Sequence, residues 1–312
     1  MKDRLGRRDF LKVSAVSMAG VFGGCSQQMS NTGNEEPILR IGVVADIQYA
    51  DRDPVSQYNS YYRPSIPKFE EFVDKMNSES LDFVIQLGDF ADRDVKSYDK
   101  LLPIWNKLKA PKRSVIGNHD MEAAGSYPVV LEKLGLEKPY YDFVVKNWRF
   151  IVIDTNDIGV LGSKEGDSRR EKALRYIELM EELGYPNARV WNSTVSDEQV
   201  EWVRSRLELA NSNGESAIVF GHHTIVSNEP GLDIWNPGRL IKCFRDNESF
   251  KAYICGHHHE GSFVKINDDH YLTMNAMMST PDTSAYSIME LYDDRIAVNG
   301  FGRQQDMVLP IK

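Results

Sequence analysis

Five short apolar runs in this chain each end at a small residue that is followed at once by an oxygen or nitrogen side chain. The five segments that follow these runs are Asp46-Ile-Gln48, Gly88-Asp89, Gly117-Asn118-His119-Asp120, Gly221-His222-His223 and Gly256-His257-His258-His259. Six of the seven histidines of the chain lie in them. Because parallel strands bring their carboxyl ends to one edge of a sheet, we expect these side chains to converge.

The first third of the chain alternates between two apolar periodicities. Short β-branched runs predict strands at 39–45, 82–87 and 113–116, and apolar residues at helical spacing predict helices at 65–77 and near 98–108. Strands that alternate with helices predict an α/β fold with a parallel sheet.

The remainder of the chain predicts a hairpin at 140–146 and 148–154, helices at 167–183 and 196–211, and strands at 217–220 and 252–255. Ser196 and Gln199 have the spacing of a capping box. Residues 262–301 alternate short strands with turns, which predicts an antiparallel meander. No linker rich in Pro, Gly or Ser interrupts residues 38–303, so we expect one domain there, followed by a C-terminal tail at 304–312.

Charge limits the choice of partner. The 312 residues include 37 basic and 46 acidic side chains, which gives a net charge of −9 and a pI of about 5.4. Nucleic acid is therefore not an expected partner, because binding to its phosphate backbone requires a basic face. Cys243 and Cys255 lie in apolar runs and are expected to be buried thiols, although the sequence leaves open a single bridge between them.

The N-terminal 25 residues are predicted to be a targeting segment. Arg7-Arg8-Asp9-Phe10-Leu11-Lys12 resembles a twin-arginine export signal, and the apolar run that follows is too short to span a bilayer. Phe22-Gly23-Gly24-Cys25 resembles a bacterial lipobox, and residues 26–37 are polar like a flexible tether. We expect an exported bacterial protein, periplasmic or held at a membrane only through lipidated Cys25; a cytoplasmic amphipathic leader is the alternative.

The side chains that follow the strands are of the metal-binding type. Carboxylates, a carboxamide and imidazoles without any thiolate suit a divalent ion such as Mn, Zn or Fe. A carboxylate can bridge two such ions, and a pair of ions can stabilise the attacking and leaving oxygens of a displacement. The chain has neither a G-x-S-x-G nucleophile motif nor a Gly-rich phosphate loop, so the expected nucleophile is a metal-bound hydroxide.

The order of these motifs resembles that of the calcineurin-type metallophosphoesterases. The family pattern D-x-[H/Q], GDxxDR, GNHD, GHH, GHxH corresponds here to Asp46/Gln48, Gly88–Arg93, Gly117–Asp120, Gly221–His223 and Gly256–His259. Gln48, where His is usual, and Tyr61-Tyr62-Arg63 are similar to the manganese-dependent ADP-ribose/CDP-alcohol diphosphatase subfamily. The resemblance covers residues 38–303.

This resemblance implies a four-layer α/β/β/α sandwich and a site for two divalent metal ions. Asp46, Gln48 and His259 would hold one ion, Asn118, His222 and His257 the other, and Asp89 would bridge them. The amide oxygen of Gln48 favours Mn, with Fe, Zn or Mg as alternatives. His119 would donate a proton to the leaving oxygen or stabilise phosphoryl charge. Asp120 would either orient His119 or cap a turn.

Other residues near the motifs have two interpretations each. His223 could exchange roles with His222, and His258 could support the metal site or be exposed. Arg93 could bind substrate phosphate or form a surface salt bridge. The aromatic residues Tyr49 and Phe90, and the cluster Tyr58, Tyr61 and Tyr62, could stack on the substrate or pack their own loop. Trp191-Asn192 and Trp235-Asn236 are expected to anchor loops, with pocket lining as the alternative.

The expected activity is hydrolysis of phosphoanhydride or phosphodiester bonds in nucleoside-diphosphate-linked compounds of the ADP-ribose or CDP-alcohol type. The expected partner is thus a small phosphorylated substrate. The alternatives are a phosphomonoesterase or phosphodiesterase that acts on lipid head groups or cyclic nucleotides, and a surface lipoprotein that binds metal without catalysis.

Overall fold

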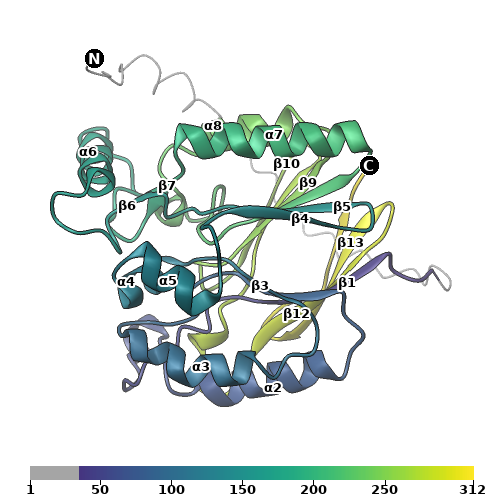
Figure 1. Cartoon of the computed structure of the whole chain (residues 1–312), viewed down its shortest axis with the longest axis horizontal. Coiled ribbons are helices and arrows are strands. Elements are labelled where there is room, and N and C mark those ends of the chain that lie inside the picture. Colours follow the sequence, from purple (N-terminus) through teal and green to yellow (C-terminus); the bar gives the residue numbers. More distant parts are fainter. Residues whose placement is uncertain (1–34) are drawn as a thin grey trace. The chain divides into compact units, whose positions relative to one another are not determined.

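Two six-stranded sheets lie face to face and carry helices on their outer sides (Figure 1). The computed structural model describes residues 35–312, of which Ile38–Lys312 form one compact unit. The predicted export signal, the lipobox and most of the tether fall in residues 1–34, outside the described residues.

The first sheet has the strand order β14-β13-β12-β1-β2-β3. Its strands are β1 Leu39–Val44, β2 Phe83–Gln86, β3 Lys112–Ser114, β12 Ala285–Leu291, β13 Arg295–Gly302 and β14 Met307–Pro310. β1, β2 and β3 are parallel, as predicted, whereas β12, β13 and β14 add antiparallel pairs. The sheet is therefore mixed.

The second sheet has the order β10-β11-β9-β8-β5-β4. Its strands are β4 Tyr141–Val145, β5 Trp148–Val152, β8 Ser216–Phe220, β9 Phe250–Cys255, β10 Ser262–Ile266 and β11 Asp269–Thr273. Its four inner strands are parallel, and β4 and β10 pair antiparallel at the two edges. The carboxyl ends of β5, β8 and β9 consequently share one edge.

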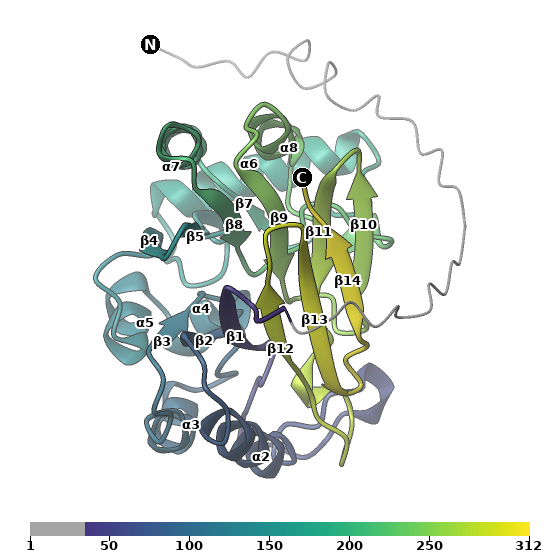
Figure 2. The same cartoon turned by 90° about the vertical axis from the view of Figure 1, so that its right-hand side faces the viewer.

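Side chains alternate between two hydrophobic layers along each inner strand. In β1, Ile41 and Val43 point into the core between the sheets, whereas Val44 packs beneath the helices. Helices α2 (Ser65–Asn77) and α3 (Tyr98–Trp105) cover the first sheet, and α7 (Asp197–Asn213) and α8 (Gly238–Arg245) cover the second (Figures 1 and 2). The predicted four-layer α/β/β/α architecture is confirmed.

Smaller elements surround the strand ends where the polar motifs lie. They are α4 (Asn118–Ala124), α5 (Tyr127–Leu134), α6 (Ser168–Glu182) and the short strands β6 (Ile158–Gly159) and β7 (Ser193–Thr194). No helix between residues 35 and 312 combines the length and the apolar character that crossing a bilayer requires.

The C-terminal region differs from the prediction of one meander ending before a tail. β10 and β11 belong to the second sheet, and the chain then crosses to the first sheet to form β12, β13 and β14. β14 lies within residues 304–312, the predicted tail, and Leu309 is fully buried in the core between the sheets. Local alternation predicts strands correctly but does not tell which sheet each strand joins.

Two further predictions have mixed outcomes. Ser196 Oγ caps α7 by accepting from the backbone N–H of Gln199 at 3.2 Å, but the Gln199 side chain does not complete a capping box. It instead binds the backbone N–H and carbonyl of Asp154 at 2.7 and 3.0 Å, which ties α7 to the end of β5.

Cys243 and Cys255 are buried free thiols, so the alternative of a bridge between them is wrong.

Candidate metal centre

The predicted metal ligands gather where strands of both sheets end. Asp46 and Asp89 follow β1 and β2, and Asn118 begins the helix after β3. From the second sheet, His222 follows β8, and His257 and His259 follow β9. Contacts join these six side chains, so segments that are up to 213 positions apart in the sequence form one cluster, as the sequence predicted.

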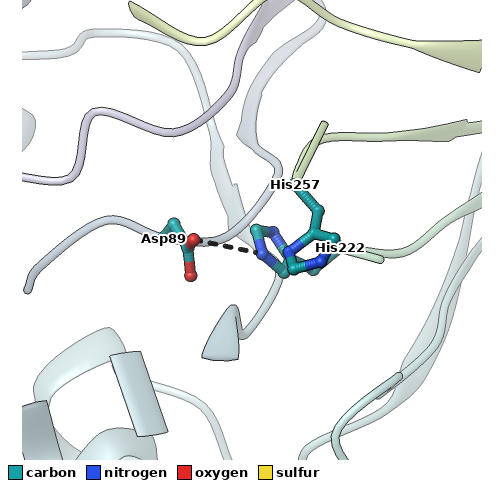
Figure 3. Close-up of side chains that lie close together, drawn as sticks. All are labelled: Asp89, His222 and His257. Atoms are coloured by element: carbon teal, nitrogen blue, oxygen red, sulfur yellow. Dashed lines mark ion pairs between the residues drawn. The ribbon is translucent and has the colours of Figure 1, made fainter. Parts of the chain in front are cut away.

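One group of potential metal donors consists of Asp89, His222 and His257 (Figure 3). Nε2 of His222 lies 3.3 Å from Oδ2 of Asp89. Oδ1 of Asn118 lies 2.9 Å from the same nitrogen and 3.0 Å from Nδ1 of His257. All four side chains are buried, so water cannot satisfy them freely.

Hydrogen bonds on the far side of each ring decide which nitrogen faces this group. Nδ1 of His222 donates to the carbonyl of Leu87 at 2.8 Å, and Nε2 of His257 donates to Oδ1 of Asn192 at 3.1 Å. In the neutral ring of His257 the inward nitrogen therefore carries a lone pair that faces Oδ1 of Asn118. Burial lowers the pKa of His222, but the charge of Asp89 raises it to about 9, so without a metal the inward nitrogen of His222 keeps a proton between it and these oxygens. The lone pairs of His257 Nδ1 and Asn118 Oδ1 face each other with no proton between them and repel, and a cation would remove that repulsion.

A second group of potential donors consists of Asp46, Asp89 and His259. Nε2 of His259 lies 3.8 Å from Oδ1 of Asp46. Gln48 adjoins Asp89, because its backbone N–H donates to the carbonyl of Asp89 at 2.8 Å, and its side-chain Nε2 donates to Oδ2 of Asp92 at 3.2 Å. Its Oε1 is buried without a hydrogen-bond partner among the described residues, as is Oδ2 of Asp89. These orphaned oxygens, and an Asp89 shared by both groups, fit a site for two cations.

The charges of the site also favour bound cations. Burial, assisted by the charge of Asp89, raises the pKa of Asp46 to about 7. Burial would also raise the pKa of Asp89, but His222 and His119 hold it well below its usual value. Burial lowers the pKa of His259 to about 4 and that of His257 well below its usual value, so both rings are neutral, the form that binds metal.

The backbone is strained at the positions that bear the donors. Asp46, Gln48, Asp89 and His257 have φ values of 51°, 47°, 50° and 70°, in the left-handed region that residues with a Cβ rarely adopt. The glycines of the motifs permit close approach of chain segments: a Cβ at Gly117 would lie 2.1 Å from the backbone nitrogen of Asp89. Such packing fixes the donors before any ligand binds.

A third group of side chains, formed by Asp92, His119 and Glu122, borders the metal centre. Nδ1 of His119 lies 2.9 Å from Oδ1 of Asp92 and 3.2 Å from Oε2 of Glu122. The backbone N–H of His119 donates to Oδ1 of Asp89 at 2.8 Å, which places the residue beside the shared carboxylate. Burial lowers the pKa of His119, but Asp89, Asp92 and Glu122 together raise it well above the usual value.

Comparison with known proteins identifies the family. The family model of the calcineurin-like phosphoesterases matches residues 39–261. The chain belongs to this family. It is therefore a metal-dependent phosphoester hydrolase.

Relatives and solved structures match this chain over nearly their whole length. The chain is 24% identical to the manganese-dependent ADP-ribose/CDP-alcohol diphosphatase of Danio rerio, over 88% of this chain and 99% of that protein. It is 26% identical to the protein of the same name from Arabidopsis thaliana, over 86% and 96%. The crystal structure of a dimetal phosphatase from Danio rerio shares the fold, with a TM-score of 0.82, 23% identity and coverage of 89% and 100%.

Asp120 does not orient the ring of His119 in this phosphoesterase. Its carboxylate accepts from the backbone N–H groups of Phe90, Ala91 and Gly117 at 3.0–3.2 Å, and from Tyr98 Oη at 2.8 Å. The ring of His119 contacts Asp92 and Glu122 instead. The prediction that Asp120 orients His119 is therefore wrong, and the alternative, a turn cap, agrees with the structure.

Phe90 is not available to a substrate. It is fully buried and packs edge-on against Phe69, with ring centroids 5.6 Å apart, and against Trp105 at 5.9 Å. Its neighbour Asp89 turns toward the site, so Phe90 turns into the core beneath α2 and α3. The prediction of a substrate contact at Phe90 is wrong.

Two other predicted substrate residues line one pocket. Arg93 is partly exposed, and its guanidinium lies 3.3 Å from Asp92 and 3.2 Å from Glu122, so the salt-bridge alternative describes its present contacts. Tyr49 is largely buried but lines the same pocket as Arg93. Of the tyrosine cluster, Tyr62 is buried and Tyr58 is the most exposed, at 67%.

His223 and His258, the remaining histidines of the motifs, have different surroundings. His223 uses both ring nitrogens within the protein, with Thr155 Oγ1 at 2.8 Å and the carbonyl of Trp191 at 3.0 Å. His222, and not His223, thus faces Asp89. His258 is buried, with Nε2 3.8 Å from Glu229.

Sequence reasoning missed the role of Asp92 and left that of Asn192 open. The GDxxDR motif includes Asp92 without giving it a role, yet its buried carboxylate contacts Gln48, His119 and Arg93. For Asn192 the sequence predicts a loop anchor, with pocket lining as the alternative, and the structure shows a contact of each kind. Its Nδ2 anchors the loop by donating to the carbonyls of Asn187 and Gly231, and its Oδ1 holds His257. Only the motif position of Asp92 offered a signal.

Proposed function

We propose that this phosphoesterase hydrolyses the diphosphate bond of nucleoside-diphosphate-linked compounds, of the ADP-ribose or CDP-alcohol type, with two divalent cations. The observation that carries the proposal is the position of Asp89, which belongs to both groups of buried metal donors. The substrate class is supported by relatives named manganese-dependent ADP-ribose/CDP-alcohol diphosphatases, which match this chain over 86–88% of its length.

Each cation would take its ligands from both sheets. Asp46, Gln48 and His259 would hold one cation, and Asn118, His222 and His257 the other, with Asp89 between them. Two bound cations would lower the pKa of a water molecule and neutralise charge that develops on phosphoryl oxygens. The protein contributes a rigid frame, because ring nitrogens and carboxylates are fixed by contacts to Leu87, Asn192 and backbone N–H groups.

His119 is proposed to serve the leaving group. Asp92 and Glu122 hold the proton on its Nδ1, so Nε2 is the nitrogen left to meet a substrate. Burial lowers the pKa of the ring, but the neighbouring carboxylates, Asp92 and Glu122 among them, raise it, which favours the form that carries a proton on Nε2 as well. It donates that proton to the leaving oxygen, or stabilises negative charge there.

Manganese is the proposed metal. Gln48 offers an amide oxygen at a position where the family commonly has an imidazole, and oxygen donors favour Mn or Mg over Zn. We therefore expect the protein, purified without added ions and analysed by atomic emission, to contain Mn in preference to Zn. Zn at full occupancy, with activity that Mn cannot restore, would contradict this assignment.

A substrate panel tests the reaction. After removal of metals with EDTA and reloading with Mn²⁺, we expect faster turnover of ADP-ribose and CDP-choline than of cyclic AMP or 4-nitrophenyl phosphate. Products should be AMP or CMP together with a phosphorylated sugar or alcohol. Faster turnover of monoesters or of cyclic AMP would favour the rival phosphomonoesterase or phosphodiesterase, and bound metal without turnover would favour a binding protein.

We also propose export through the twin-arginine route and lipidation at Cys25, on the strength of residues 7–12 and 22–25 alone. The double variant Arg7→Lys/Arg8→Lys should accumulate in the cytoplasm, and Cys25→Ser should lose incorporation of radiolabelled palmitate. Unchanged localisation and labelling in these variants would refute the proposal.

A further inference from the structure

A basic pocket lies beside the proposed reaction centre. It has a volume of about 510 Å³, and four of its lining residues are cationic, namely Arg52, Arg93, Lys96 and Lys100. A volume of this order accommodates a small ligand group. The concentration of cations is unusual for this chain, which carries a net charge of −9.

The acidic residues of the pocket are already engaged. Oδ1 of Asp51 lies 2.6 Å from Nε of Arg63, and Oδ1 of Asp94 accepts from the backbone N–H of Lys96 at 2.9 Å. Within residues 35–312, by contrast, no carboxylate forms an ion pair with Arg52, Lys96 or Lys100. The pocket therefore holds three cationic side chains without ionic partners, which suits an anionic ligand and opposes a metal ion.

Arg93 connects this pocket to His119. It lines the pocket, and its guanidinium lies 3.3 Å from Oδ1 of Asp92 and 3.2 Å from Oε1 of Glu122. Both carboxylates also contact Nδ1 of His119. Tyr49, which also lines the pocket, directly follows Gln48 in the chain, and its carbonyl accepts from the backbone N–H of Asp92 at 2.9 Å. The pocket is thus separated from the His119 ring by the carboxylates that hold the ring.

We propose that the basic pocket binds a phosphomonoester group that the nucleotide substrate carries in addition to its diphosphate, such as a phosphate on the ribose. This inference rests on the proposed function, because it assumes a nucleotide at the metal centre. A phosphate dianion matches the three cations better than a single carboxylate does, and arginine and lysine are the side chains that bind phosphate in proteins. The pocket then selects among nucleotides by their extra charge.

The first test compares two substrates in the Mn²⁺-loaded protein. A solvent-exposed charge pair strengthens binding by about fivefold at most, and the extra phosphate can pair with more than one cation of the pocket. We therefore expect kcat/KM for 2′-phospho-ADP-ribose to exceed kcat/KM for ADP-ribose by about tenfold. In the double variant Lys96→Ala/Lys100→Ala, this ratio should fall toward one. The matched control Lys107→Ala/Lys109→Ala removes two exposed lysines from the loop that follows α3, outside the pocket, and should keep the ratio. A wild-type ratio of one, with ADP-ribose cleaved, would overturn the pocket assignment and leave the proposed function standing.

A second measurement does not depend on turnover. Isothermal titration calorimetry should show adenosine 2′,5′-bisphosphate binding about tenfold more tightly than AMP, with the difference lost in Lys96→Ala/Lys100→Ala and kept in the control. Equal affinities would overturn the proposal even if ADP-ribose is not a substrate. A second outcome would also overturn the proposal: adenosine 2′,5′-bisphosphate and AMP bind equally well, and the double variant loses binding to phosphatidylglycerol vesicles. The pocket would then bind a lipid surface.

Discussion

Oδ1 of Asp92 lies 2.9 Å from Nδ1 of His119, and this contact determines how the histidine presents its other nitrogen. The second oxygen of the same carboxylate accepts from Nε2 of Gln48 at 3.2 Å, which turns Oε1 of Gln48 away from Asp92. One fully buried carboxylate therefore orients a proposed proton donor and a proposed metal ligand together.

The variant Asp92→Asn should disturb the contact with Gln48 or the contact with His119, but not both. An asparagine has one oxygen in place of two, so its NH2 group must face either Gln48 or His119 and will misorient one of them. We expect kcat to fall by roughly 10- to 100-fold, with weaker Mn²⁺ binding if Gln48 is the residue that turns. Steady-state kinetics across a range of Mn²⁺ concentrations will measure both effects. Asp99→Asn, at an exposed position on α3, serves as the control and should behave as wild type. Unchanged kinetics in Asp92→Asn would show that Asp92 orients neither Gln48 nor His119.

Asp89→Asn should abolish turnover while the fold survives. The change removes a charge that both groups of metal donors share, and it keeps the size of the side chain. We expect turnover of bis(4-nitrophenyl) phosphate to drop by roughly a hundredfold or more, with fewer than two Mn ions bound per chain. Circular dichroism checks the fold, and metal analysis counts the ions. Full activity in the metal-stripped variant would end the two-metal mechanism.

Bound manganese should stabilise the fold. The donors come from the ends of strands in both sheets, so a cation that binds them binds the folded chain alone. At 100 times its Kd, a ligand of this kind adds about 2.7 kcal/mol to the free energy of unfolding, which corresponds to a rise in Tm of roughly 5 °C. Differential scanning calorimetry with EDTA or with Mn²⁺ will measure the shift. Asp89→Asn should lose most of it, and an equal shift in that variant would mean that Mn²⁺ binds elsewhere.

The sequence predicts the centre of this molecule better than its periphery. The strands and helices from Leu39 to Ser114 follow the predicted boundaries closely, because apolar periodicity there is strong and the helices cover neighbouring strands. Convergence of Asp46, Asp89 and His222 follows from strand topology alone. Assignment of β10 and β11 to one sheet and β12 to the other depends on long-range pairing, which local pattern does not encode.

Residues next to the metal donors were harder to predict, because a single peptide step reverses the direction of a side chain. Phe90 follows Asp89 but packs into the core, and Asp120 follows His119 but binds backbone N–H groups of the neighbouring loop. Asp92 gave the opposite error, since its place in the GDxxDR motif indicates that it lies near the site but not that its carboxylate contacts Gln48 and His119. Motif membership therefore indicates proximity to a site, whereas the role depends on loop geometry.

Asp154, at the end of β5, should make stability depend on pH. Its carboxyl group is fully buried between Tyr127 and the backbone N–H of Asn156, and burial raises its pKa from 3.8 to about 7. Below about pH 4 the group is protonated in both the folded and the unfolded chain. Between about pH 4 and 7 the unfolded chain releases this proton and the folded chain keeps it, so the free energy of unfolding falls as the pH rises. The fall attributable to Asp154 is about 4 kcal/mol at most.

Asp154→Asn removes this titration and keeps the shape of the side chain. The difference in the free energy of unfolding, variant minus wild type, should therefore increase between pH 4.5 and 7.5 and remain constant above that range. Urea denaturation in the presence of EDTA measures it, because metal binding is then excluded and the carboxylates of the metal centre titrate alike in both proteins. A difference that stays flat from pH 4.5 to 7.5 would show that Asp154 is ionised in the folded chain, held in that form by the hydroxyl of Tyr127 and the N–H of Asn156.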